Sequence, residues 1–146
     1  MTDTLIQSKT ENFTISHLSP SVAEFAALRE KIGWGKTDEK MAEISLANSL
    51  FHVTLREQDR LIAMGRVIGD GAMFFYIQDV IVAPGYQQRG LGHIVMQQIE
   101  DYLLSAAATG ATIGLLAAKG KEGFYRRYGY RDRCGETLGL GMCKFV

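Results

Sequence analysis

One stretch of the sequence limits the possible folds of this chain more than any other. It is a strand-like run, followed by a glycine loop and a long helix-like segment. Phe74 to Val82 is rich in aromatic and β-branched residues, which predicts a strand. Gly90 to Ala107 repeats apolar residues at helical spacing, which predicts an amphipathic helix. We expect the buried face of this helix to consist of Ile94, Val95, Ile99, Tyr102 and Leu103. A strand, a glycine loop and a helix in this order favour an α/β domain.

The residues before the glycine loop predict an antiparallel meander. Strands are expected over 51–56, 60–68 and 74–82. Gln58-Asp59 and Gly69-Asp70-Gly71 carry the residue types of tight turns. Strands joined by such short turns pair with their neighbours in antiparallel order.

A short strand and two helices are predicted ahead of the meander. Residues 13–15 suit a short first strand. Ser21 and Glu24 have the spacing of a capping box, so we expect the first helix to begin there. Residues 37–39 place acidic groups where a second helix begins, and that helix is expected to run towards Asn48.

The C-terminal third predicts further strands around a short helix. Residues 112–117 are apolar enough for a strand in the interior of a sheet. Residues 122–128 predict a short helix, and Gly129 suits its C-terminal end. Two closing strands are expected over 130–134 and 138–145.

Composition limits the class of protein. The chain has 146 residues, which fits a single domain over 1–146. Sixteen basic residues balance sixteen acidic ones, and this argues against a dedicated nucleic-acid binder. Cys134 and Cys143 lack a CxxC pair or nearby histidines, so we expect no metal site and interpret both as reduced thiols packed in the closing strands.

The lack of long apolar runs predicts the cellular compartment. Residues 1–12 are polar and contain no signal-peptide segment, and no run in the chain approaches the length of a membrane span. We therefore expect a cytoplasmic protein without membrane partners.

The glycine loop has the features of a phosphate site. Gly90 and Gly92 remove side chains where backbone amides at a helix N-terminus would approach a ligand. The helix dipole adds positive potential there, which favours a pyrophosphate. A Walker loop would require a Gly-Lys-Ser/Thr ending, which this segment lacks. A Rossmann loop would follow a parallel βαβ start, whereas this loop follows an antiparallel meander.

Two motifs resemble the GCN5-related N-acetyltransferase (GNAT) superfamily. Gln87-Gln88-Arg89-Gly90-Leu91-Gly92 is similar to the family's acetyl-CoA signature, Gln/Arg-x-x-Gly-x-Gly/Ala. Gly123-Phe124-Tyr125-Arg126-Arg127-Tyr128-Gly129-Tyr130 is similar to its Phe-Tyr-x-x-x-Gly-Phe/Tyr element. The resemblance covers roughly 74–130, and the interval between the motifs leaves room for one helix and one strand.

The resemblance implies a fold. It is of the α/β (α+β) class, with a mixed, twisted and mostly antiparallel sheet of six to seven strands and helices on both faces. The sheet would be splayed between its fourth strand, 74–82, and its fifth, 112–117. Acetyl-CoA would enter that gap as the co-substrate.

The resemblance also implies the residues that bind acetyl-CoA. The pantetheine arm would pair like a strand with the backbone of 80–82, and the amides of 88–93 would hold the pyrophosphate. Arg89 would contact a phosphate or lie in solvent. The complete set of candidate positions is Val80, Ile81, Val82, Gln87, Gln88, Arg89, Gly90, Leu91, Gly92, His93 and Tyr125.

The implied catalytic groups are Val80 and Tyr125. The family's oxyanion donor falls on the amide of Val80, aimed into the gap by a bulge in the strand. Tyr125 matches the general acid that protonates the leaving thiolate. The base is open, because Tyr76 stands where histone-type members have a Glu. Asp79 is the nearest carboxylate; alternatives are a water chain, an amine that arrives neutral, and an Asp79 that is simply paired inside the structure.

The implied reaction is acetyl transfer from acetyl-CoA to a primary amine in a ternary complex, with a small molecule preferred as acceptor. Peptide or protein N-acetylation and a non-catalytic CoA-binding regulatory module are the alternatives. The resemblance also implies a homodimer formed through the last strands. Candidate acceptor-site residues are Trp34, Tyr76 and Gln78, with Lys36, Glu136 and Met142 as further positions.

Overall fold

The structure, a computed structural model, describes residues 4–8 and 11–146, with side chains described from Phe13 onward. The chain divides between Leu115 and Leu116 into two compact units. Each unit is described separately below.

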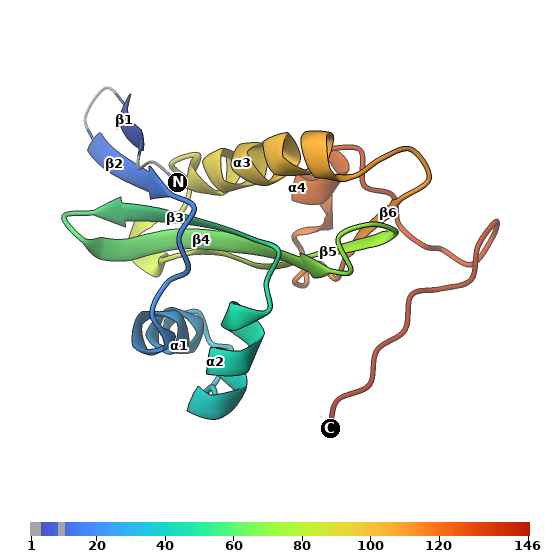
Figure 1. Cartoon of the computed structure of the whole chain (residues 1–146), viewed down its shortest axis with the longest axis horizontal. Coiled ribbons are helices and arrows are strands. Elements are labelled where there is room, and N and C mark those ends of the chain that lie inside the picture. The colour runs from blue at the N-terminus through green and yellow to red at the C-terminus, as the bar shows by residue number, and fades with distance from the viewer. Residues whose placement is uncertain (1–3, 9–10) are drawn as a thin grey trace. The chain divides into compact units, whose positions relative to one another are not determined.

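Between residues 4 and 115 the described strands form one mixed sheet in the order β1-β2-β3-β4-β5-β6 (Figure 1). Neighbouring strands are antiparallel up to β5, and β6 pairs with β5 in parallel. The predicted meander is therefore confirmed. The strands are β1 (Thr4–Ser8), β2 (Glu11–Ser16), β3 (Phe51–Glu57), β4 (Arg60–Gly69), β5 (Phe74–Val82) and β6 (Thr112–Leu115).

Helices cover both faces of this sheet. In Figure 1, α1 (Val22–Lys31) and α2 (Glu39–Ala47) lie on one face and α3 (Leu91–Ala106) lies on the other. The predicted capping box is present, because Ser21 accepts from the Glu24 amide while Glu24 accepts from the Ser21 amide. Asp38 caps α2 by accepting from the Met41 amide.

The core lies on both sides of the sheet. On one side, Phe25 and Leu28 of α1 pack with Leu46 of α2 against Met64 and Ile81 of the sheet. On the other side, Val95, Ile99 and Leu103 of α3 are buried as predicted. Of the remaining predicted residues on that helix, Ile94 is half-buried, and Tyr102 is half-buried and stacks on Phe51 with ring centroids 4.5 Å apart.

The sheet contains a β-bulge in β5. Arg66 pairs with Gln78 and Met64 pairs with Ile81, so two steps along β4 match three steps along β5. Asp79 adopts a φ of +54° within this irregular stretch. One extra residue opposite a single partner is the definition of a bulge, so the bulge expected in this strand is confirmed.

β6 pairs with only part of β5. The register runs from Phe74↔Thr112 to Ile77↔Leu115, where β6 ends. Residues 78–82 of β5 continue past that last pair while remaining paired with β4 on the other side. The strand predicted over 112–117 is thus shorter than expected.

The second unit, residues 116–146, contains α4 (Glu122–Arg126) and no strand. The closing strands predicted over 130–134 and 138–145 are wrong. Gly135, Gly139 and Gly141 interrupt this stretch, and glycine weakens a strand because it loses more backbone entropy and packs no side chain.

Two further expectations depended on these closing strands. Cys134 and Cys143 are free and exposed, so they do not pack in a sheet. The expected count of six to seven strands included both closing strands. The other five predicted strands are present. The edge strand β1 was not predicted from the sequence. In the part of the chain that the structure describes, no helix combines the length and hydropathy needed to cross a bilayer.

Candidate active site

The bulge lies in the part of β5 that β6 does not pair with, and Val80 belongs to this part. Val80 is half-buried, and Gly65 lies on β4 opposite the irregular stretch. A Cβ at Gly65 would come within 2.7 Å of Val95 Cγ1 and 3.5 Å of Val80 Cγ2. The side chain of Val80 therefore lies on the α3 side of the sheet, where α3 packs closely over Gly65.

The glycine loop leads from β5 into α3 as predicted. A short 3-10 helix, η1 (Pro84–Tyr86), follows the strand, and α3 begins after Gly90. Gln88 and Gly90 adopt φ values of +63° and +79°. Gly90 is the N-cap, and no side chain caps the first turn of this helix. An N-terminus capped by glycine presents backbone N–H groups without a side-chain oxygen that competes for them.

Contacts at both ends hold the loop in place. Gln87 Nε2 donates to the Val82 carbonyl over 3.1 Å, and Leu91 is buried at the start of α3. Tyr86 Oη donates to Glu57 over 2.8 Å, and this hydrogen bond raises the pKa of the Tyr86 phenol. The Arg89 guanidinium lies 5.3 Å from the centre of the Tyr86 ring. Gln87, Gln88, Arg89, Gly90 and His93 are exposed, and Gly92 is half-buried.

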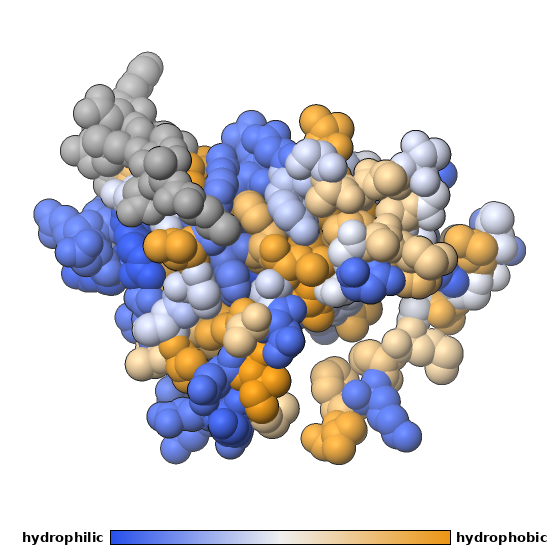
Figure 2. Space-filling view, viewed as in Figure 1, coloured by the Kyte–Doolittle hydropathy of each residue, from blue (hydrophilic) through white to orange (hydrophobic). Residues whose placement is uncertain are grey.

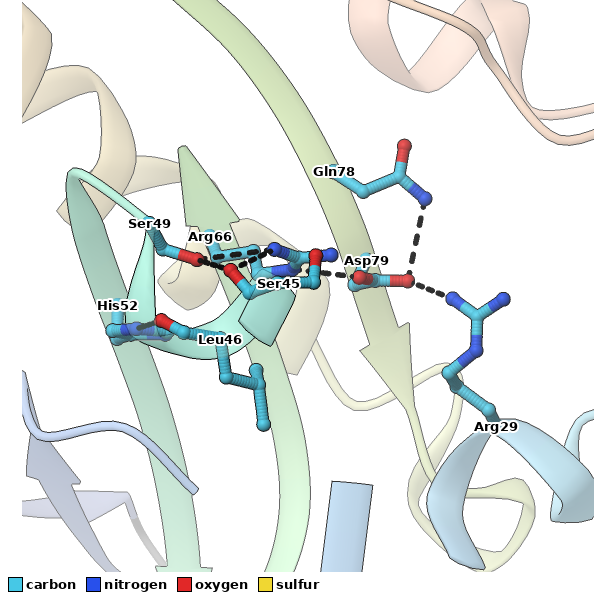
Figure 3. A network of polar contacts seen from close by, with 8 residues as sticks. All are labelled: Arg29, Ser45, Leu46, Ser49, His52, Arg66, Gln78 and Asp79. Atoms are coloured by element: carbon cyan, nitrogen blue, oxygen red, sulfur yellow. Dashed lines mark hydrogen bonds and ion pairs between the residues drawn. The ribbon is translucent and has the colours of Figure 1, made fainter. Parts of the chain in front are cut away.

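Asp79 is the buried acid of a polar network on the opposite face (Figure 3). Its side chain is fully buried. Arg29 Nη1 donates to Oδ1, and Arg66 Nε donates to Oδ2 over 2.8 Å. Of the roles considered for this residue, pairing inside the structure is what is observed.

The candidate acceptor residues lie on one strand and in one loop. Tyr76 and Gln78 lie on β5 and are half-buried. Gln78 Nε2 donates to Asp79 Oδ1 over 3.3 Å. Trp34 follows α1, is 39% exposed, and its ring centre lies 5.1 Å from the Arg29 guanidinium carbon. Arg29 therefore joins the Trp34 loop to the strand that carries Asp79.

The exposed surface of α2 is partly apolar. Figure 2 shows both hydrophobic and hydrophilic residues over the region of α2. Met41 and Ile44 of α2 are 70% and 53% exposed, whereas Ala42 and Leu46 are buried. Lys36 is exposed between the two helices.

Tyr125 lies on α4 in the second unit. It is half-buried, and its ring meets Phe124 edge to face with centroids 5.1 Å apart. Arg126 donates to Asp132 through Nε and Nη2 over 3.0 and 2.7 Å. This pair lowers the pKa of the exposed Asp132 carboxyl. Glu136 and Met142, also in this unit, are exposed.

Sequence reasoning missed the roles of Arg29 and Arg66. A signal was present for Arg66, because it is the one charge inside the otherwise apolar run from Leu61 to Ile68. A charge in a buried strand requires a partner of opposite sign. Nothing in the sequence distinguished Arg29 from the other charges of its helix.

Comparison with known proteins decides the family. Residues 26–143 match a family model described as an acetyltransferase (GNAT) domain. The chain belongs to the GNAT superfamily. The match extends from α1 into the second unit, beyond the interval that the two sequence motifs covered.

Curated relatives of this GNAT chain carry acetyltransferase names. It is 32% identical over 111 residues to an uncharacterized N-acetyltransferase, ycf52, from Porphyra purpurea, covering 73% of this chain and 63% of the relative. It is 32% identical over 120 residues to the histone acetyltransferase TAP1 of Glycine max, covering 75% and 51%. GCN5-related N-acetyltransferase 1, chloroplastic, of Arabidopsis thaliana is 31% identical over 129 residues, covering 86% and 60%. The chain thus spans between about half and two thirds of the length of these relatives.

Solved structures show the same fold. A Staphylococcus aureus protein of unknown function, titled a probable acetyltransferase, aligns with a TM-score of 0.82 at 31% identity, covering 90% of this chain and 99% of that one. A GNAT-family acetyltransferase from Streptococcus pneumoniae aligns with a TM-score of 0.73 at 25% identity, covering 92% and 98%. The mixed α/β architecture of this chain is therefore that of the GNAT fold.

Proposed function

We propose that this chain transfers an acetyl group from acetyl-CoA to a primary amine, preferably that of a small molecule, in a ternary complex. The bulge at Asp79 and Val80, in the strand that leads through the glycine loop into a glycine-capped helix, carries the proposal. The GNAT family supports acetyltransferase activity, and such enzymes typically take acetyl-CoA as donor. Because the family model crosses the boundary between the two units, we also propose that both belong to one catalytic domain.

The residues of the first unit fit an acyl-CoA ligand. Positive φ values at Gln88 and Gly90, with no side-chain cap on α3, favour an anion at that N-terminus. We propose that backbone amides of 88–93 and the loop residues Gln87 and Arg89 hold the pyrophosphate. Residues 80–82 would pair with the pantetheine arm through their main chain, since the side chain of Ile81 is 2% exposed.

In the proposed reaction, the acetyl carbon forms a bond to the amine nitrogen while its bond to sulfur breaks. The Val80 amide donates to the acetyl oxygen as negative charge develops there. Tyr125 gives its proton to the departing sulfur. The amine attacks in its neutral form, either because it arrives neutral or because water takes its proton. Its nitrogen then loses a second proton to water as the amide forms, and the Tyr125 phenolate regains its proton from water. We do not assign either amine proton to Asp79, because both of its carboxylate oxygens already accept hydrogen bonds.

The acceptor is proposed to lie beside Trp34, Tyr76 and Gln78, whose side chains are exposed or half-buried. The relative from Glycine max is named a histone acetyltransferase, so a peptide acceptor is the second candidate. We further propose a cytoplasmic enzyme that forms a homodimer through its C-terminal residues. Leu138, Leu140, Met142 and Phe145 are all more than 60% exposed in the single chain, which supports such a contact.

A thiol-release assay tests the function. The full chain is incubated with acetyl-CoA and a panel of small primary amines, and separately with peptides that have a free N-terminus or a lysine. We expect amine-dependent release of CoA, with the highest kcat/KM on a small amine. Tight CoA binding without turnover on any acceptor would instead identify a non-catalytic CoA-binding module and contradict the proposal.

The Tyr125→Phe variant tests the proposed acid. Its kcat should fall by roughly 100-fold or more, because the thiolate leaves without a proton. Its affinity for acetyl-CoA should stay close to that of the wild type. Tyr128→Phe, a matched loss of a hydroxyl in the same unit, should keep its turnover. If Tyr125→Phe has the same kcat as the wild type across the pH range, Tyr125 is not the general acid.

A further inference from the structure

Three charged side chains form one network beneath the bulge of β5 (Figure 3). The side chain of Asp79 is fully buried, that of Arg66 is 7% exposed and that of Arg29 is 24% exposed. Two cations therefore share a single carboxylate. Ions removed from water persist only where their partners are well placed, so this geometry is tightly specified.

The backbone of Asp79 is unusual for its position. Its φ of +54° lies in the left-handed region, which side-chain-bearing residues rarely occupy. The other described non-glycine residues with positive φ are Gln58, Asp59 and Gln88, all in a turn or a loop. Asp79 alone among these four lies within a strand. A conformation of this kind persists when surrounding contacts stabilise it.

The side-chain contacts require this backbone. Neighbouring residues of a regular strand point to opposite faces of the sheet. Here the adjacent side chains of Gln78 and Asp79 touch, as Gln78 Nε2 lies 3.3 Å from Asp79 Oδ1. Gln78 is the register partner of Arg66, which bonds Asp79 as well. The left-handed turn at Asp79 thus brings its carboxylate to the face of the sheet where the two guanidinium groups lie.

The network also fixes the bulge to both helices of that face. Arg29 belongs to α1 and packs with its guanidinium carbon 5.5 Å from the centre of the Phe25 ring. Arg66 Nη1 donates to the Ser45 carbonyl over 3.2 Å and to Ser49 Oγ over 3.0 Å. Ser45 lies on α2 and Ser49 just beyond its end. The bulge is therefore held from three elements.

We propose that Asp79 is a positioning residue, which through Arg29 and Arg66 holds the bulge in the conformation that aims the Val80 amide at the acyl oxygen. The inference rests on the proposed acetyl transfer, and it assigns Asp79 a role other than that of the base. Loss of either guanidinium contact should then act on catalysis in the same way as loss of the carboxylate, although an arginine cannot serve as a base at neutral pH.

Steady-state kinetics of four proteins test this role: wild type, Asp79→Asn, Arg29→Gln and the double variant. Asparagine tolerates the left-handed region, so Asp79→Asn removes the charge without excluding the backbone conformation. We expect each single variant to lower kcat by roughly 10- to 100-fold, because a misplaced donor loses its effect on the transition state. KM for acetyl-CoA should change little, and the double variant should be no slower than the slower single variant.

The pH dependence separates positioning from proton transfer. In Asp79→Asn the residual kcat should keep the shape of the wild-type pH profile. Loss of its acidic limb in Asp79→Asn but not in Arg29→Gln would show that Asp79 accepts the proton, and would overturn the proposal. Independent, multiplicative effects of the two substitutions would overturn it as well.

A matched control excludes general loosening of α1. Arg56 donates to Glu24 through Nη1 and Nη2, each over 2.7 Å, and links the same helix to β3 away from the bulge. The Arg56 side chain is 24% exposed, as is that of Arg29. Arg56→Gln should therefore leave kcat unchanged; a fall equal to that of Arg29→Gln would contradict the positioning role.

A readout without turnover distinguishes failure of the inference from failure of the proposed function. The amide resonance of Val80 in a proton–nitrogen spectrum should move more with acetyl-CoA than with CoA in the wild type. This difference should vanish in Asp79→Asn, or in Arg29→Lys if the former does not fold. No difference in the wild type would refute the oxyanion assignment itself, whereas an unaltered difference in the variant would refute only the role of Asp79.

Discussion

Gly69 at the end of β4 shows how a single backbone position fixes a turn. Its φ is +146°, and a Cβ there would lie 2.1 Å from the carbonyl oxygen of Phe74. The next residue, Asp70, accepts hydrogen bonds through Oδ1 from the amides of Ala72, Met73 and Phe74. These bonds lower the pKa of the exposed Asp70 carboxyl. The Gly69 conformation and the Asp70 hydrogen bonds together set where β5 begins.

Gly69→Ala should destabilise the fold by roughly 3 kcal/mol, because the new methyl group collides with backbone rather than with a side chain that can move. Gly71→Ala is the matched control, since its Cβ would meet only Leu50 Cδ2 at 3.6 Å. Gly71→Ala should lower the free energy of unfolding by about 1–2 kcal/mol, because alanine must then adopt the left-handed conformation that Gly71 has. Urea unfolding measures both, and equal losses would contradict the steric argument.

The sequence predicted positions better than it predicted interactions. The turn residues, the Ser21 and Glu24 capping box and the glycine of the α3 N-terminus follow from local chemistry, which sequence patterns report. The contact of Asp79 with Arg29 joins residues 50 positions apart, and only the folded chain brings them together. Tyr125 and Val80 were assigned by resemblance to the family, and their roles stay predictions.

At the scale of elements, His52 connects β3 to the end of α2. Its Nε2 donates to the Leu46 carbonyl over 3.0 Å, since a carbonyl can only accept. Its Nδ1 is buried without a hydrogen-bond partner. Burial lowers the pKa of His52 below the ordinary value of 6.5; the bond to Leu46 acts in the opposite sense, and the charge of Arg66 lowers the pKa further.

Stability should therefore depend on pH through His52. The folded state holds this ring neutral, so its contribution is complete above pH 6.5 and is lost as the pH falls from there towards the lowered pKa. In that window the free energy of unfolding should fall by up to about 1.4 kcal/mol per pH unit from this group. Urea midpoints at successive pH values measure the slope. His52→Gln cannot titrate and should show a shallower slope; identical slopes would refute the assignment.

Elements whose partners are close in sequence were the easiest to predict. β3, β4 and β5 form two hairpins, and Gln58 and Asp59 both have the positive φ that a two-residue turn requires. Closing strands were predicted over 130–134 and 138–145, but a strand exists only where another strand pairs with it. No such partner is present in the second unit, residues 116–146.

At the scale of the whole molecule, the family match and the fold agree. The chain aligns with the solved structures from Staphylococcus aureus and Streptococcus pneumoniae over 90% of its length or more. The two motifs lie in different units, residues 87–92 in the first and 123–130 in the second. A ligand that engages both motifs should therefore stabilise both units, because binding to the native state alone raises the free energy of unfolding.

Calorimetric titration of the pure, folded full chain with acetyl-CoA is the most direct measurement of the central claim. It should be made at two temperatures, so that a small heat at one of them does not conceal binding. The account predicts saturable binding to one site per chain, with CoA competing for the same site and Gly90→Val binding more weakly. An absence of affinity for both CoA and acetyl-CoA, in protein that unfolds cooperatively and is therefore folded, would contradict it.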